Sequence, residues 1–291
     1  MKEFNMRLTH LHHCRGMSWK MIYNILKKDP ELKFLYNDAP RQIIPQVMTA
    51  QDTHSNVLQD LHSDRILEQI RLYSQNGIRA ITIFEKEYPI LLKETYQPPW
   101  VLYARGDTSL LNSGTHLAVV GSRQATDYGE KAIQLIFPKL IEQGVIIVSG
   151  LAAGIDAIAH KEAIKNKGKT IGVIAGGLFH IYPQANQKLA YEMMKNHLVI
   201  SEYPPYTRPS RWQFPMRNRI ISGISKGTLI IQAKSKSGSL ITANYAVQEG
   251  REVFAVPGNI FSPFSGGTNE LIQQGAKLVK SAEEILEEFP Y

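Results

Sequence analysis

The chain has 291 residues, of which 43% are hydrophobic, a length that suffices for one large domain and a smaller one. It has no apolar run of 18 residues and no signal-peptide pattern, which excludes a transmembrane helix and predicts a cytoplasmic protein. Its single cysteine, Cys14, excludes an internal disulfide, and the formal net charge of +7 favours an anionic partner.

The N-terminal part is predicted to be a small helical module over residues 1–77. Apolar residues recur at three- and four-residue spacing in residues 18–28 and 63–77, and Gly77 is expected to end the second helix. His12, His13 and Cys14 are adjacent, so on a helix they point in different directions, which argues against a metal site.

Two short strand-like runs follow, residues 79–84 and 100–107, with prolines between them. We interpret residues 78–111 as a connector that docks on the main domain. The main domain is expected to span residues 112–291.

The main domain shows a different pattern, in which continuous apolar runs alternate with helical segments. Six runs are predicted to be strands: residues 117–123, 144–150, 169–177, 197–204, 227–234 and 251–258. Strands that are apolar on both faces are typical of a sheet that helices cover on both sides. The fold class is therefore predicted to be α/β, a doubly wound and mostly parallel sheet whose ligand binds at the carboxyl edge of the strands.

The loop after the first of these strands contains Gly121, Ser122 and Arg123 before a predicted helix. Small residues there would admit a phosphate to backbone N–H groups beside a helix N-terminus, and Arg123 would add a forked donor. A tight turn with no ligand explains the small residues equally well.

The next loop repeats this arrangement with Gly150, ahead of a helix that carries Asp156 and His160 one turn apart. Such a pair could act as a general base. We favour a cap or a structural hydrogen bond, because no Ser or Cys in a nucleophile elbow accompanies the pair.

The stretch 203–248 carries seven basic residues and no Asp or Glu, a charge pattern typical of a binding face. Within it, basic and aromatic residues alternate: Arg211, Trp212, Phe214, Arg217 and Arg219. Unpaired bases can stack on rings while arginines bind phosphates, so this pattern favours single-stranded nucleic acid. Trp212 is expected to be at least half buried and Phe214 to be the stacking residue, although both rings could instead belong to the core.

A second phosphate-binding loop is predicted at the end of the following strand. It contains Lys234, Lys236, Ser237, Gly238 and Ser239, just before a helix.

Two nucleotide motifs are incomplete. Gly168-Lys169-Thr170 resembles the end of a P-loop, but it lacks the first glycine and precedes a strand. The first strand-turn lacks the dinucleotide glycine pattern, and the second strand is not followed by the acidic residue that would hold a ribose. ATP hydrolysis, NAD binding and any other cofactor are therefore not expected.

Eight loops resemble, in order, those of the DprA/Smf family of DNA-processing proteins over residues 80–280: GSRQATDYG, SGLAAGIDAIAH, GGLFHIYPQAN, ISEYPP, FPMRNRIISGIS, KSGSLITA, AVPG and GGTNELIQQGAKLV. The resemblance implies an extended Rossmann-like domain that binds single-stranded DNA, protects incoming DNA and loads the RecA recombinase in natural transformation, as a homodimer without catalytic activity. The DNA-binding residues that it implies are Arg123, Arg211, Phe214, Arg217, Asn218, Arg219 and Lys234 to Ser239.

The resemblance is looser at the two ends of the chain. The N-terminal module is similar to the family's SAM-like helical domain, but Arg15-Gly16-Met17-Ser18 replaces a glycine-bearing hairpin suited to DNA. Many relatives continue into a winged-helix domain, which is not expected here because the chain ends at Tyr291. Dimer and recombinase surfaces are implied around Leu271–Leu286, where an apolar helix face could equally be intramolecular core.

Two other functions remain as alternatives. Nucleoside-monophosphate hydrolases of the LOG type have a Pro-Gly-Gly-x-Gly-Thr-x-x-Glu signature, whose halves resemble Pro257-Gly258 and Gly266–Glu270. Residues 259–265 separate these halves, which is expected to disrupt a compact phosphate loop. The second alternative is a structural adaptor whose basic residues have no ligand.

Overall fold

The structure is a computed structural model that describes residues 2–37 and 51–289. The chain divides into two compact units, one formed by Met1–Tyr88 with Pro99–Tyr103 and the other by Pro89–Pro98 with Ala104–Tyr291. The segment interpreted as a connector, residues 78–111, is therefore shared between them. Of the predicted N-terminal module, residues 38–50 lie outside the described part.

The first unit is mainly helical. Its elements are α1 (Lys2–His13), α2 (Trp19–Lys28), α3 (Lys33–Asn37), α5 (Gln51–Leu61), α6 (Asp64–Gln75) and β1 (Ile78–Thr82). The two helices predicted from apolar spacing are confirmed as α2 and α6. Ser18 caps α2 by accepting a hydrogen bond from the Met21 N–H at 3.4 Å, and Gly77 follows α6 with a φ of 65°.

The histidines of α1 have protein partners. The His12 ring bonds to the Tyr103 hydroxyl at 3.1 Å, and His13 bonds to Tyr73. The buried Cys14 thiol donates to the His10 carbonyl oxygen at 3.5 Å. Within residues 2–37 and 51–289, no group of three His, Cys, Asp or Glu side chains could hold a metal ion.

The second unit is built on a parallel sheet in the order β6-β5-β4-β3-β7-β8-β9. The chain enters it through β2 (Val101–Gly106), whose first residues belong to the first unit. The remaining strands are β3 (Thr115–Val120), β4 (Val145–Ser149), β5 (Thr170–Ile174), β6 (Leu198–Ser201), β7 (Gly227–Ile230), β8 (Glu252–Ala255) and β9 (Lys277–Leu278). All six strands predicted for this domain are confirmed. The two-residue β9 was not predicted, because so short an edge strand leaves no apolar run.

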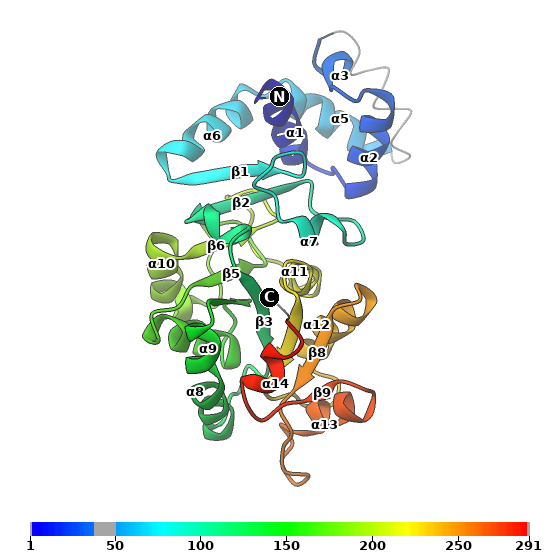
Figure 1. The fold of residues 1–291 in the computed structure, drawn as a ribbon. Coiled ribbons are helices and arrows are strands. Elements are labelled where there is room, and N and C mark those ends of the chain that lie inside the picture. The colour runs from blue at the N-terminus through cyan, green and yellow to red at the C-terminus, as the bar shows by residue number, and fades with distance from the viewer. Residues whose placement is uncertain (1, 38–50, 290–291) are drawn as a thin grey trace. The chain divides into compact units, whose positions relative to one another are not determined.

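Helices cover both faces of this sheet. They are α7 (Ile90–Lys93), α8 (Asp127–Glu142), α9 (Ile155–Lys165), α10 (Gln187–Asn196), α11 (Gln213–Gly223), α12 (Gly238–Gln248), α13 (Gly266–Gln273) and α14 (Glu283–Leu286). Figure 1 shows α8, α9 and α10 on one side and α11, α12 and α13 on the other. The doubly wound fold is thus confirmed, and the winding direction reverses between β3 and β7. Loops that leave this switch point on opposite faces open a crevice between them.

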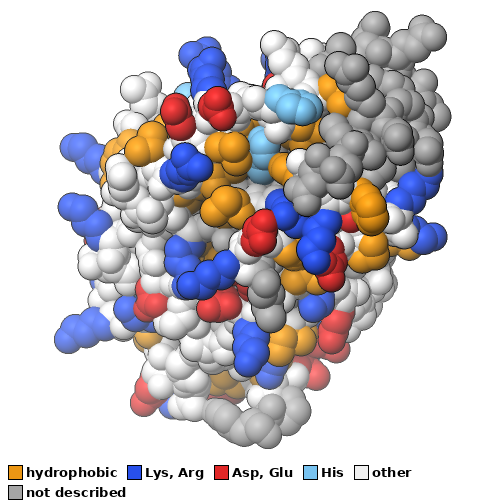
Figure 2. Space-filling view, turned by 90° about the horizontal axis from the view of Figure 1, so that it is seen from above, with side chains coloured by type: hydrophobic (Ala, Val, Ile, Leu, Met, Phe, Trp, Pro, Cys, Tyr) orange, Lys and Arg blue, Asp and Glu red, His pale blue; other side chains and the backbone are white. Residues whose placement is uncertain are grey.

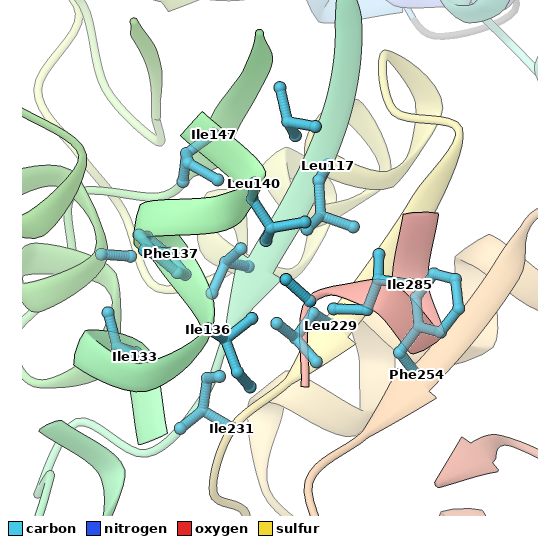
Figure 3. Packing of buried hydrophobic residues seen from close by; sticks show 14 of the residues in the cluster. Leu117, Ile133, Ile136, Phe137, Leu140, Ile147, Leu229, Ile231, Phe254 and Ile285 are labelled. Carbon is cyan, nitrogen blue, oxygen red and sulfur yellow. The ribbon is translucent and has the colours of Figure 1, made fainter. Parts of the chain in front are cut away.

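The core lies between the sheet and α8 (Figure 3). Leu117, Ile147 and Leu229 of three neighbouring strands belong to one cluster with Phe137 of α8, and all four side chains are fully buried. Ile285 of α14 belongs to the same cluster. The apolar side of the last helix is therefore intramolecular core at this position, which was one of the two alternatives for Leu271–Leu286.

Charge is mixed on the face shown in Figure 2. Lys and Arg side chains are spread among acidic and hydrophobic ones in that view. On that face the Lys and Arg side chains do not gather into one basic patch. In the part of the chain that the structure describes, no helix is long and apolar enough to span a membrane.

His160 is a fully buried histidine of α9 whose Nδ1 proton is assigned by one hydrogen bond and whose neutral state follows from burial. Its Nδ1 lies 2.7 Å from the Thr170 hydroxyl, which itself donates to the Ile147 carbonyl oxygen at 2.8 Å. The hydroxyl proton is thus used, so Nδ1 carries a proton and donates it. Burial is the main cause that lowers the pKa of His160 from 6.5 to about 3.

We expect His160 to make folding sensitive to acid. The unfolded chain protonates this ring near pH 6.5 and the folded chain does not, so its stability contribution is complete above that pH and is lost as the pH falls toward about 3. Between pH 6.5 and 5, the unfolding free energy of His160→Phe should fall less than that of the unmodified protein, by on the order of 1–2 kcal/mol. Denaturant unfolding at several pH values measures this, with exposed His62→Gln as control. Equal slopes for His160→Phe and the unmodified protein would contradict it.

Candidate nucleic-acid interface

A cleft of about 900 Å³ opens at the carboxyl ends of the strands, at the switch point between β3 and β7. Its walls are the loops after β3 and β7, together with the first residues of α11 and α12. Eleven residues predicted for the site line it: Gly121, Ser122, Arg123, Arg211, Phe214, Arg217, Asn218, Lys234, Ser237, Gly238 and Ser239. Four others, Gly150, Arg219, Ser235 and Lys236, do not line it.

Arg123 and Phe214 lie against each other in the lining of the cleft. The guanidinium carbon of Arg123 lies 5.6 Å from the centroid of the Phe214 ring, a cation–π distance. Tyr182 meets the same ring edge-to-face, with centroids 5.7 Å apart. A cation and two rings thus come together from two loops and the first turn of α11. This arrangement can hold a planar apolar group beside a negative charge.

The backbone of the turn that carries Arg123 is held by contacts within the protein. The Ser122 N–H donates to the Gln232 carbonyl oxygen at 2.8 Å. A Cβ at position 121 would lie 2.7 Å from Ile155, so Gly121 permits close packing against α9. The tight-turn interpretation therefore has direct support for these two residues, and the exposed Arg123 side chain remains the group of this loop that is free to meet a ligand.

The opposite wall of the cleft is the N-terminus of α12. Ser237 precedes this helix without a side-chain cap, and its hydroxyl lies 2.7 Å from that of Ser239. The Lys234 ammonium reaches Gln124 of the Arg123 loop at 3.2 Å. A helix N-terminus, two hydroxyls and an ammonium group on one wall form a favourable environment for an anionic oxygen. Lys236 is exposed outside this wall, with a φ of 66°.

Arg217 lies at the floor of the cleft and is only 4% exposed. Its Nη1 donates to the Val173 carbonyl oxygen at 2.7 Å. Burial lowers its pKa to about 10, and Asp156 opposes this shift, so the guanidinium is charged at neutral pH. Burial raises the pKa of the Asp156 carboxyl, while Arg217 lowers it. Asp156 also accepts from the Gly150 N–H at 3.2 Å and thus holds the floor together; His160 bonds to Thr170 instead.

Gly150 has a packing role next to this arginine. A Cβ at position 150 would lie 1.7 Å from the Arg217 Nη1, so only glycine allows the guanidinium to rest on the loop after β4.

Arg219 follows the cleft residue Asn218 but does not line the cleft, and it forms a buried ion pair with Glu202. Its Nε and Nη1 atoms are buried and have no hydrogen-bond partner among the described residues. Burial raises the pKa of Glu202, and the neighbouring guanidinium opposes this shift. The pair joins α11 to the end of β6.

The prediction that Trp212 is at least half buried is wrong, since 62% of this residue is exposed. Trp212 is the cap residue before α11, and its ring meets Tyr203 edge-to-face at 5.9 Å outside the core. Its apolar character was therefore misleading. A residue just before a helix need not face the side that the helix buries.

Nine residues that line the cleft were not predicted for the site, and four of them, Gln124, Tyr182, Pro209 and Ile241, come from four different parts of its lining. Tyr182 had a usable signal, because it follows β5 and the carboxyl ends of parallel strands share one edge. Gln124, Pro209 and Ile241 have no residue type or spacing that distinguishes them from ordinary loop and helix positions.

The fold and the cleft define a doubly wound α/β protein with a cationic and aromatic site at its switch point. The family model described as DNA recombination-mediator protein A matches residues 79–290, and the chain belongs to this family. It is 54% identical over 218 residues to DNA processing protein DprA of Bacillus subtilis, covering 75% of this chain and 73% of the relative. Identity to DNA processing protein DprA of Streptococcus pneumoniae is 45% over 212 residues, covering 73% and 74% of the two chains.

Solved structures agree with this assignment. The X-ray structure of DprA from Streptococcus pneumoniae aligns with a TM-score of 0.87 at 36% identity, over 99% of this chain and 98% of that one. A structure of DprA from Helicobacter pylori, described in terms of its single-stranded DNA binding mode, aligns with a TM-score of 0.66 at 31% identity, over 73% and 95%.

Proposed function

We propose that this protein binds single-stranded DNA in the cleft at the switch point. The observation that carries the proposal is the Arg123–Phe214 contact, which sets a cation against a ring at 5.6 Å on the cleft wall. Unpaired bases stack on aromatic rings, and arginine pairs with the phosphates between them. The described binding mode of the Helicobacter pylori relative supports the same ligand class.

The cleft offers separate places for base and backbone. A base would lie against Phe214, which Tyr182 contacts edge-to-face. The adjoining phosphates would meet Arg123 on one wall and Lys234 with the start of α12 on the other. Arg211, exposed on the rim, would add a further phosphate contact. Arg217 would act from below by fixing the floor.

The proposal extends to the biological role. We propose that the protein, as a homodimer without enzymatic activity, protects incoming single strands and loads the RecA recombinase on them in natural transformation. Membership of the recombination-mediator family supports this role. Recombinase filament formation on single strands coated with a single-strand-binding protein tests it, since the chain should accelerate filament growth there.

We expect single strands to bind more tightly than a duplex of the same sequence. Bases in a duplex are paired and stacked on one another, so they are not free to lie against the Phe214 ring in the cleft. With about six phosphates engaged, log affinity should fall with log salt at a slope of about −4. Fluorescence anisotropy at several salt concentrations measures both properties. Equal affinity for both forms, or a slope near zero, would refute the proposal and leave the adaptor alternative.

One structural observation keeps the nucleoside-monophosphate alternative testable. The two halves of its signature do meet, because the Gly258 N–H donates to the Asn269 side chain and that side chain donates back to the Gly258 carbonyl oxygen, both at 3.1 Å. Glu270, however, accepts from the Ser235 hydroxyl at 2.6 Å. Incubation with AMP should release no adenine; release would favour the hydrolase.

A further inference from the structure

An exposed apolar tip lies on the loop between β8 and α13. Ile260 is 82% exposed and Phe261 is 88% exposed. Figure 1 shows this loop extending from the body of the second unit near α13. No core contact explains two large apolar side chains at such a position, so a ligand contact has to be considered.

The loop is held at several points, so the tip does not depend on the ligand for its shape. The Asn269 amide ties Gly258 at the start of the loop, and the Ala233 N–H donates to the Phe264 carbonyl oxygen at 2.8 Å near its end. At the tip, the Asn259 side chain accepts from the Phe261 N–H at 2.9 Å. A preformed turn presents a ring at a lower entropic cost than a flexible one does.

The foot of the loop adjoins the cleft through one lysine. The Lys234 ammonium lies 4.8 Å from the centroid of the Phe264 ring and also bonds to Gln124. Lys234 lines the cleft, whereas Phe264 belongs to the loop. No Asp or Glu occurs from Val253 to Asn269, so the loop itself adds no negative charge beside this lysine.

We infer that Phe261, with Ile260 beside it, is a second stacking site, which receives a base of a single strand that leaves the cleft past Lys234. The inference rests on the proposed function. Its occupant is nucleic acid because the foot of the loop adjoins a cationic wall and the loop lacks acidic residues, which suits a polyanion. A strand too short to pass Lys234 would not reach the tip.

The test compares oligothymidines of increasing length. Phe261→Ala should leave the Kd of the shortest strand that binds the unmodified protein unchanged within twofold, and should raise the Kd of longer strands by roughly 5- to 100-fold. Phe261→Trp should keep the affinity for long strands, whereas Phe261→Leu should lose it, since leucine is apolar but has no ring. Tyr96→Ala, which removes another strongly exposed ring, is the matched control and should change nothing.

Several outcomes would overturn the inference. Long strands bound normally by Phe261→Ala would refute the second site and leave the proposed function intact. Equal losses at all lengths would place Phe261 in the cleft's own function, and a changed oligomeric state at unchanged affinity would assign the tip to protein contact. If the unmodified protein binds no single strand, both the proposed function and the inference fail.

Discussion

Replacing Arg123 by alanine is expected to weaken single-strand binding by roughly 10- to 100-fold, the loss of one charge-assisted contact. The guanidinium is exposed, lines the cleft and faces the Phe214 ring. Because surface substitutions rarely change stability by more than about 0.5 kcal/mol, the melting temperature should stay within about 2 °C. Anisotropy with oligothymidine and thermal unfolding of the same sample measure the two effects.

The control for this substitution is Arg71→Ala on α6, which removes one exposed arginine from the first unit. It should leave the affinity within about twofold if charge acts only locally. A large drop in melting temperature for Arg123→Ala would show a structural role and contradict the prediction. An equal loss of affinity in both variants would point to net charge as the cause.

Replacing Arg219 by methionine is expected to have the opposite profile. Removing one partner of a buried ion pair leaves Glu202 with an unpaired charge, at a cost of about 3–5 kcal/mol. For a domain of this size the melting temperature should fall by roughly 6–20 °C. The loss should be smaller at pH 5 than at pH 8, because burial already raises the pKa of Glu202 and without the arginine the carboxyl takes up a proton more readily.

Adding Glu202→Gln to Arg219→Met separates charge from packing. The double variant removes both charges of the Arg219–Glu202 pair, so most of the lost stability should return. At a temperature where each variant is folded, single-strand affinity should be near that of the unmodified protein, since Arg219 does not line the cleft. A double variant as unstable as Arg219→Met would show that packing of the arginine stem dominates.

Most of the fold could be predicted from the sequence because its strands are buried on both faces. Runs such as residues 144–150 are apolar without alternation, and only a sheet covered on both sides places every residue of such a strand in the core. The edge strand β9 has two residues and no such run. The division of residues 78–111 between two units depends on long-range contacts that local patterns do not encode.

The site could be predicted less completely, because residue type does not reveal where a side chain points. Arg211, Arg217 and Arg219 lie on one short segment, yet the first is exposed at the cleft and the other two are buried. The carboxylates that face them, Asp156 and Glu202, come from other parts of the chain. An acid-free stretch therefore indicated a binding face, although part of its charge is neutralised from outside the stretch.

The contact between Gly150 and Arg217 has a consequence for how the two sides of the sheet depend on each other. Position 150 in the loop after β4 has no room for a side chain, because Arg217 of α11 fills the space. The chain reaches α11 only after two more strands. A single methyl group on that loop would displace the guanidinium from both Val173 and Asp156. The packing of a helix on one face of the sheet thus restricts which residue can follow a strand on the other side. Gly150 looks like part of a turn, but it leaves the space that the guanidinium of Arg217 occupies.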